Sequence, residues 1–269
     1  MPLNEEFASA LAAMREKRPL VHCITNYVTA GDVANMLLAA GASPIMADDP
    51  AEAAEIPADA LVLNMGTPSE SRFSAMLKAA AAANENGVPV VLDPVGVQLS
   101  EIRRAAARKF LSELKIAVIR GNLSEMLFLS GVHASSRGVD NAEEREESVR
   151  LYAAGELARR YGCVCALTGA EDIVTDGTRA VRLLNGCAAL KRVSGAGDMT
   201  SALIAAFSAV CEPYKAAIFG TAFTGICGEL SDYIPSCRYM GSFRENLFDN
   251  AGRDAEDLSA RLRGEILNG

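Results

Sequence analysis

The segment VSGAGD, residues 193–198, places a carboxylate beside small residues where an apolar helical pattern begins. Small residues leave backbone N–H groups open to an anion, and a helix N-terminus adds the positive end of its dipole. We expect the backbone of Gly195, Ala196 and Gly197 to stabilise a transferred phosphoryl group. Asp198 would accept a hydroxyl proton as general base, a contribution of about 10²–10⁴-fold. The alternative is that Asp198 only caps the helix, because Asp is favoured at such ends.

Polar or backbone-rich segments also follow the other predicted buried strands. They are NMGTPSE after 60–63, DPVG after 88–92, RGNLSE after 116–119 and TGAED after 163–167. Because ligands of an open parallel sheet bind beyond the carboxyl ends of its strands, these segments should meet at one rim. That convergence favours a reaction centre over a helix cap at Asp198.

The segments RGNLSE and LDPVG contain charged groups that could bind a nucleotide and its metal. Arg120 directly follows a predicted strand, and its planar guanidinium suits phosphates. Asp93 and Glu125 could hold Mg²⁺ through waters, because this ion usually takes only one or two protein carboxylates. Structural roles are the alternatives. Asn122 and Glu125 have the spacing of a capping box, and Asp93 could form a turn before Pro94.

Other kinds of active site find little support in the residues. We expect His133 in a solvated loop, and His22 either in the core of a strand or against a substrate. No nucleophile motif accompanies them, and the P-loop pattern ending in Gly-Lys-Ser/Thr is absent. Met46 and Met65 have core character but stand at strand ends, where an apolar side chain could pack on a flat heteroaromatic ligand.

Buried strands alternate with helices along most of the chain. Short apolar runs predict strands at PLVHCIT, SPIMA, ALVLNMG, VPVVLD, KIAVIRG, CVCALTG, DIVTDG and AVRLLNG. Helices are expected at 29–40, 69–86 and 100–114, and two or three long helices from 197 onward. Nearly continuous apolar strands indicate a parallel sheet that is covered on both faces. We predict a layered α/β fold in which residues 1–269 form one domain.

The composition of the 269 residues excludes several partners. A net charge of −8 argues against nucleic acid, because phosphate backbones are bound largely by Lys and Arg patches. No run reaches the roughly 18 apolar residues of a membrane span, and the N-terminus lacks the pattern of a secretory signal. We therefore expect a cytoplasmic protein with no membrane partner. The seven cysteines are scattered and form no zinc set, so core packing is their expected role.

Several longer motifs resemble one known family. Segments similar to those of hydroxyethylthiazole kinases are PLVHCITNYVT, GASPIMA, LVLNMGT, GVPVVLDPVG, VIRGNLSE, ALTGAEDIVTDG and VSGAGD. These are thiamine-salvage enzymes of the ribokinase-like superfamily. The segments GICGEL and GSFRENLFD extend the likeness, which runs from about residue 19 to about residue 250.

The resemblance implies a three-layer ribokinase-like fold with a central, mostly parallel sheet, and it implies a reaction. ATP would phosphorylate the hydroxyl of 4-methyl-5-(2-hydroxyethyl)thiazole with Mg²⁺, in a homotrimer whose active sites lie between neighbouring subunits. By motif, the thiazole would contact Met46, Gly195, Asn26 and Gly66, and ATP would contact Arg120, Thr168, Asp93 and Glu125, the last two also serving the metal.

The chain departs from many members of that family at one position of the glycine motif. Those members have Cys where this chain has Asp198, whereas the wider superfamily generally uses Asp there as the base. An aspartate is ionised at neutral pH and a cysteine thiol mostly is not. This chain is therefore suited to abstract a proton directly.

Other functions of the same fold stay open. One is a related kinase for hydroxymethylpyrimidine or pyridoxal, which only the pocket expected around Met46 and Met65 opposes. Another is an ATP- or ADP-dependent NAD(P)H-hydrate dehydratase, which shares the fold and a Gly-Asp motif but makes no phosphorylated alcohol. A third is a nucleotide-binding regulator without turnover, which would need no base such as Asp198.

Overall fold

A nine-stranded sheet forms the centre of the computed structural model, which describes residues 1–132, 142–234 and 239–267. The strand order is β2-β1-β3-β4-β5-β6-β7-β8-β9. The strands are β1 (Leu20–Ile24), β2 (Ser43–Ile45), β3 (Ala60–Asn64), β4 (Val90–Asp93), β5 (Val118–Asn122), β6 (Val164–Thr168), β7 (Asp172–Thr175), β8 (Ala180–Leu183) and β9 (Gly264–Leu267). Strands β1 to β6 pair in parallel, whereas β7, β8 and β9 are antiparallel. The mostly parallel sheet expected from the sequence is confirmed.

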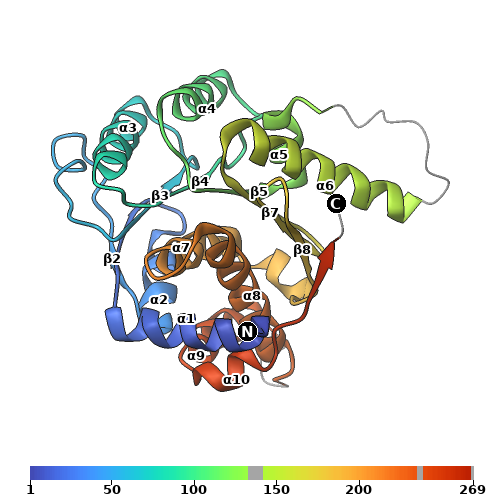
Figure 1. Cartoon of the computed structure of the whole chain (residues 1–269). Helices are drawn as coiled ribbons and strands as arrows, with labels where there is room; N and C mark the ends of the chain where they lie inside the picture. The colour runs from blue at the N-terminus through green and yellow to red at the C-terminus, as the bar shows by residue number, and fades with distance from the viewer. Residues whose placement is uncertain (133–141, 235–238, 268–269) are drawn as a thin grey trace.

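Helices cover both faces of this sheet, as Figure 1 shows. One layer contains α3 (Glu70–Glu85), α4 (Glu101–Glu113), α5 (Leu123–Ser130) and α6 (Ala142–Tyr161). The other contains α1 (Leu3–Lys17), α2 (Ala30–Ala40), α7 (Ala196–Ser208), α8 (Pro213–Asp232), α9 (Met240–Ala251) and α10 (Ala255–Ser259). A short 3₁₀ helix, η1 (Ala188–Arg192), precedes α7. The three-layer α/β fold is the one that the sequence predicts.

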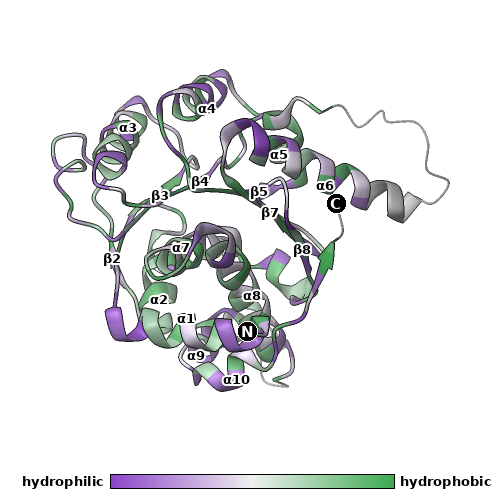
Figure 2. Ribbon diagram, in the orientation of Figure 1, coloured by the Kyte–Doolittle hydropathy of each residue, from purple (hydrophilic) through white to green (hydrophobic). Residues whose placement is uncertain are grey.

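The strands are apolar on both sides because each face meets a helix layer. All residues of β3 and β4 are buried, as continuous apolar runs in a parallel sheet should be. Two separate core clusters result, one between the sheet and α1, α2, α7 and α8, the other between the sheet and α3 to α6. Figure 2 shows the hydrophobic colour concentrated on the strands and on α8. Each strand is therefore packed on both faces, which positions the strand ends.

The parallel register brings the carboxyl ends of the strands to one rim. Asn64 at the end of β3 pairs with Asp93 at the end of β4, and Asn122 of β5 pairs with Thr168 of β6. The first turn of α7 lies over the same rim, because α7 contacts β3 and β4. The segments that follow the strands therefore meet in space as predicted.

The structure also differs from the expected elements. Strand β9 was not predicted, because three of its four residues are exposed and it lies at the sheet edge against β8. Expected helix bounds agree within one residue for α2, α3 and α4. Among the residues that the structure describes, no helix has the length and apolarity to cross a membrane.

Candidate active site

The carboxylate of Asp198 lies in the first turn of α7 and accepts three side-chain hydrogen bonds. Asn26 Nδ2 donates at 2.9 Å and Thr29 Oγ1 at 2.5 Å to one oxygen, and Asn64 Nδ2 donates at 2.9 Å to the other. Gly195 is the N-cap residue of α7, and no side-chain hydrogen bond caps the helix there. Asp198 is thus oriented by three side chains from the ends of β1 and β3 and the start of α2. The alternative of a simple helix cap is wrong.

Glycines at the start of α7 allow close approach of the neighbouring side chains. Gly195 has φ +84°, and a Cβ there would lie 2.6 Å from Thr29 Cγ2. A Cβ on Gly197 would lie 2.2 Å from Arg120 Nη1. The guanidinium of Arg120 therefore rests directly on the backbone of the turn that carries Asp198. Positive charge and helix N-terminal amides meet here, which is the arrangement that attracts phosphate.

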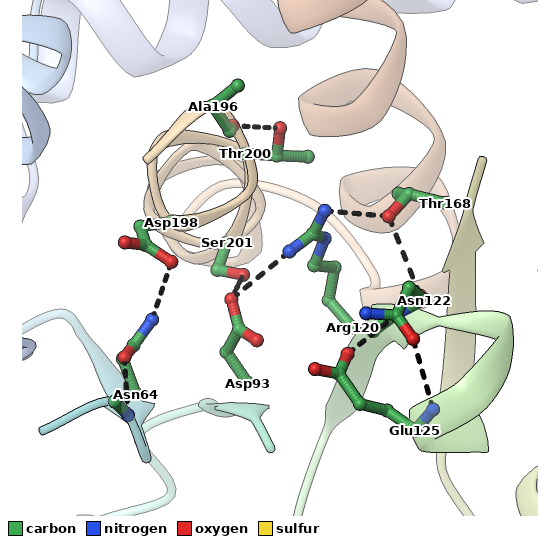
Figure 3. A network of polar contacts seen from close by, with 12 residues as sticks. Asn64, Asp93, Arg120, Asn122, Glu125, Thr168, Ala196, Asp198, Thr200 and Ser201 are labelled. Carbon is green, nitrogen blue, oxygen red and sulfur yellow. Dashed lines mark hydrogen bonds and ion pairs between the residues drawn. The ribbon is translucent and has the colours of Figure 1, made fainter. Parts of the chain in front are cut away.

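Arg120 is fixed by two partners, as Figure 3 shows. Its Nη2 donates to Thr168 Oγ1 at 2.6 Å, and its Nη1 lies 3.3 Å from Asp93 Oδ2. Ser201 Oγ of α7 donates to the same Asp93 oxygen at 2.6 Å. Asp93 is fully buried, and this burial raises the pKa of its carboxyl to about 7 despite the opposing charge of Arg120. The contacts with Thr168 and Asp93 fix the guanidinium of Arg120, which lines a cavity.

A cavity of about 550 Å³ opens beside Asp198, between the ends of β5 and β6, η1 and the helices α7 and α8. Arg120, Thr168, Gly195, Gly197 and Asp198 all line it. Residues of η1 and Thr221, Thr224 and Gly225 of α8 also line it. The cavity has the size of a small-molecule site and places a base, an arginine and helix N-terminal amides around one space. A nucleoside triphosphate fits this chemistry.

The chain is similar to known proteins along most of its length. A model of the hydroxyethylthiazole kinase family matches residues 11–253. A hydroxyethylthiazole kinase of Methanoculleus marisnigri is 47% identical over 262 residues, covering 96% of this chain and 92% of the relative. The solved hydroxyethylthiazole kinase of Pyrococcus horikoshii OT3 is 37% identical with a TM-score of 0.89, covering 98% of this chain and all of that one.

The chain belongs to the hydroxyethylthiazole kinase family. It is therefore a kinase, a phosphotransferase enzyme, as the sequence motifs predict. A solved ADP/ATP-dependent NAD(P)H-hydrate dehydratase from Bacillus subtilis has a TM-score of 0.61 and 16% identity. That likeness shows the shared fold alone.

In this member of the hydroxyethylthiazole kinase family, two of the residues predicted to contact the thiazole, Asn26 and Gly66, lie close to Asp198. Asn26 bonds Asp198 directly, and a Cβ on Gly66 would lie 2.9 Å from both Asn26 Cβ and Asn64 Oδ1. Met46 follows β2 at the same rim and is half-buried against the core, outside the 550 Å³ cavity. Met65 is fully buried and packs in the core.

His22 does not line this cavity. His22 is 2% exposed, and its Nε2 lies 2.6 Å from the carbonyl oxygen of Ala47. Because a carbonyl only accepts, His22 donates there and packs on the α3 side of β1. His133 lies outside the described residues.

Glu125 has a structural role that the sequence also predicted. It forms the capping box of α5 with Asn122, and its other oxygen accepts from the Gly96 N–H at 2.9 Å. Glu125 thereby ties the DPVG segment to α5. Both carboxylate oxygens are engaged by backbone N–H groups, which leaves them only their remaining lone pairs for other ligands.

The buried carboxylate of Asp93 has one oxygen without a hydrogen-bond partner in this structure. Asp93 Oδ1 is buried and has no hydrogen-bond partner, while Oδ2 serves Arg120 and Ser201. Within the described residues, no group of three or more His, Cys, Asp or Glu side chains could hold a metal. Mg²⁺ suits such a place, because it usually takes one or two carboxylates together with phosphates and water.

Sequence reasoning missed the side chains that hold the predicted ones. Asn64 and Thr29 donate to Asp198, and Ser201 donates to Asp93. Asp172, in the TGAED segment, accepts from the Gly169 N–H at 2.8 Å and lines the cavity. Asn64 could have been found as the last residue of a buried strand in the NMGTPSE motif, where a polar side chain faces the rim.

Proposed function

We propose that this chain transfers the γ-phosphate of ATP to the hydroxyl of 4-methyl-5-(2-hydroxyethyl)thiazole, with Asp198 as general base. One observation carries the mechanism: a carboxylate held by three side-chain donors at the helix N-terminus beside the cavity. A carboxylate that is fixed in direction can receive a proton at the moment the oxygen attacks. The family membership supplies the substrate.

In the proposed reaction one bond to phosphorus forms, one breaks, and one proton moves to Asp198. The substrate hydroxyl oxygen forms a bond to the γ-phosphorus as the bond from phosphorus to the β-phosphate oxygen breaks. The hydroxyl proton passes to Asp198, and ADP leaves with the electrons of the broken bond. Phosphoryl transfer needs mainly positioning and charge stabilisation, so few side chains suffice.

The start of α7 and Arg120 supply the charge stabilisation in this proposal. The first backbone N–H groups of a helix have no intrahelical acceptor. Ala196 N–H is directed to the Val193 carbonyl at 3.4 Å, which leaves the Gly197 and Asp198 amides as the main donors to the transferred group. The guanidinium of Arg120, which rests against Gly197, would add positive charge beside these amides. One amide donor aimed at a developing anion contributes roughly 3 kcal/mol in a water-excluded site.

Asp93, together with Glu125 through water, would hold the magnesium ion that the family implies. Bound there, the ion would neutralise phosphate charge during transfer. Asp93 offers its free buried oxygen, and Ser201 and Arg120 keep the carboxylate oriented. Glu125 also fixes the Gly96 backbone beside it.

The acceptor would bind on the other side of Asp198, where Asn26, Gly66 and Met46 lie at the ends of β1, β3 and β2. The side chains Tyr27 and Val28 beside this region are 80% and 63% exposed. The proposal therefore includes a homotrimer in which a neighbouring subunit covers these side chains and completes the acceptor pocket. The enzyme would act in the cytoplasm, where ATP is available.

The proposal is tested by ADP release with ATP, Mg²⁺ and a panel of small alcohols. Wild type should turn over with the thiazole alcohol, and Asp198→Asn should lower kcat by at least about 10²-fold. Asp249→Asn, an exposed acid of α9, is the matched control and should match wild type. Turnover only with a pyrimidine or pyridoxal alcohol would contradict the substrate. Absence of alcohol-dependent ADP release would contradict the kinase reaction itself, and a dehydratase assay would follow.

A further inference from the structure

Arg72, in the first turn of α3, donates hydrogen bonds to the turn that follows β3. Its Nη1 donates to the Thr67 carbonyl at 3.1 Å, to Thr67 Oγ1 at 2.5 Å and to the Gly66 carbonyl at 3.4 Å. The side chain is only 12% exposed, and neither Nε nor Nη2 has a hydrogen-bond partner. An arginine buried to this degree normally has a fixed task, because removing a guanidinium from water is costly.

Thr67 has a backbone conformation that a β-branched residue rarely adopts. Its φ is +44°, and Arg18 is the other non-glycine residue with positive φ among those described. Such strain persists only where the surroundings enforce it, and it concentrates at ligand-binding sites. Both oxygens of Thr67 accept a hydrogen bond from Arg72 Nη1, so this side chain contacts the strained residue directly.

Arg72 also reaches the segment that follows Met46. Its Nε lies 3.5 Å from Asp48 Oδ2. One side chain thus bridges the turn at Gly66 and Thr67 and the segment at Met46 to Asp48, the two stretches proposed to line the acceptor pocket. Neither stretch lines the cavity beside Arg120.

The turn that Arg72 holds lies directly against the residues that orient the base. The Gly66 N–H donates to Asn64 Oδ1 at 2.9 Å, and the space beside its Cα is closed by Asn26 and Asn64. Both of these asparagines donate to Asp198. A shift of the turn would therefore alter where an alcohol can sit relative to Asp198.

We infer that Arg72 is a positioning residue of the acceptor site, which holds the Gly66–Thr67 turn in its strained conformation and joins it to the Met46–Asp48 segment. The inference rests on the proposed function, because it assigns the acceptor to this side of Asp198. It predicts an effect on alcohol binding and none on nucleotide binding. It further predicts that the need for Arg72 disappears once residue 67 can adopt a positive φ without strain.

The test compares steady-state kinetics of Arg72→Met, Thr67→Gly and the double variant with wild type. Arg72→Met should raise KM for the alcohol that wild type phosphorylates by about tenfold, the order of effect expected when a strained turn is released. KM for ATP should change less than twofold, by the expectation that distant sites act independently. The double variant should recover most of the loss, because glycine adopts φ near +44° freely. Equal changes in both KM values, or no recovery in the double variant, would overturn the inference.

Arg159→Met is the matched control. Arg159 likewise donates to the carbonyl of a turn residue with positive φ, Gly177. That turn joins β7 to β8 and lies at the amino ends of the parallel strands, away from the rim. Arg159→Met should leave KM for the alcohol unchanged. An equal effect of Arg159→Met would show a general loss of stability and overturn the inference.

Hydrogen–deuterium exchange separates this inference from the proposed reaction. Arg72→Met should speed amide exchange at residues 65–68 and 46–50, and Arg159→Met should not. This readout holds even if no alcohol supports turnover, in which case the proposed function fails alone. Unchanged exchange in both segments would overturn the positioning role whatever the activity.

Discussion

The arrangement around Asp198 predicts how much catalysis depends on the residues that hold the base. Asn64 donates to Asp198 Oδ1 from the end of β3 and is fully buried. Asn64→Leu keeps the volume and removes the donor. Because a hydrogen bond to a charged group contributes about 1.5–3 kcal/mol, kcat should fall by about tenfold or more. When Asn64→Leu is added to the Asp198→Asn variant, kcat should fall little further, because the two residues act as a unit. A similar loss in both backgrounds would show that Asn64 acts independently of the base.

The buried carboxyl of Asp93 predicts a pH dependence of stability. Burial raises its pKa to about 7 from an ordinary value of 3.8. Between these values the folded protein binds a proton that the unfolded chain has lost. The contribution of this group is therefore present in full below about pH 4, by the ordinary carboxyl value. It is lost as the pH rises through about 7.

Asp93→Asn removes this dependence, which urea unfolding at several pH values measures. Between about pH 4 and about pH 7 the free energy of unfolding of wild type should fall relative to that of the variant. A difference that stays constant across this range would contradict the raised pKa of Asp93.

At the scale of elements, the first turn of α7 must have no side chain at residue 197 for Arg120 to lie against it. A methyl group on Gly197 would approach Arg120 Nη1 to 2.2 Å, so Gly197→Ala should displace the guanidinium from Asp93 and Thr168. KM for ATP should rise by about tenfold or more, because bonds from charged groups contribute about 1.5–3 kcal/mol. Gly241→Ala, in the first turn of α9 with open space around it, should leave KM for ATP unchanged. Equal behaviour of the two variants would contradict the role of close approach.

The same elements show what could be predicted from the sequence. Apolar runs predicted β1 to β8, because burial on both faces leaves a local pattern, and helical patterns predicted α2, α3, α4 and the long helices after residue 197. Strand β9 leaves none, since pairing with β8 rather than composition makes it a strand. The position of Asp198 at a helix start was predictable. Its hydrogen bonds to Thr29 and Asn64 were not, because these residues lie 169 and 134 positions away in the chain and meet Asp198 only in the folded structure.

At the scale of the whole molecule, the rim divides into two sides around Asp198. The side proposed for the nucleotide is a cavity lined by elements of this chain, from β5 to α8. The acceptor side, at the ends of β1 and β2, borders the exposed Tyr27 and Val28. Large exposed apolar side chains beside a site mark surfaces that bind other molecules. This asymmetry suits a site that one subunit builds for ATP and a neighbour completes for the alcohol.

The proposed trimer predicts what a charge on this surface would do. Tyr27→Glu would place a carboxylate where apolar area is buried between subunits, an area that stabilises association by roughly 25 cal/mol per Å². Light scattering should show wild type at about three times the chain mass of 28.4 kDa and the variant at a lower mass. KM for the thiazole alcohol should rise with the loss of assembly, because the acceptor pocket would open to water. Tyr152→Glu, on α6 and 57% exposed, is the control and should keep both the mass and the KM of wild type. A wild-type mass of one chain, or a Tyr27→Glu variant that stays assembled, would contradict an interface at this rim.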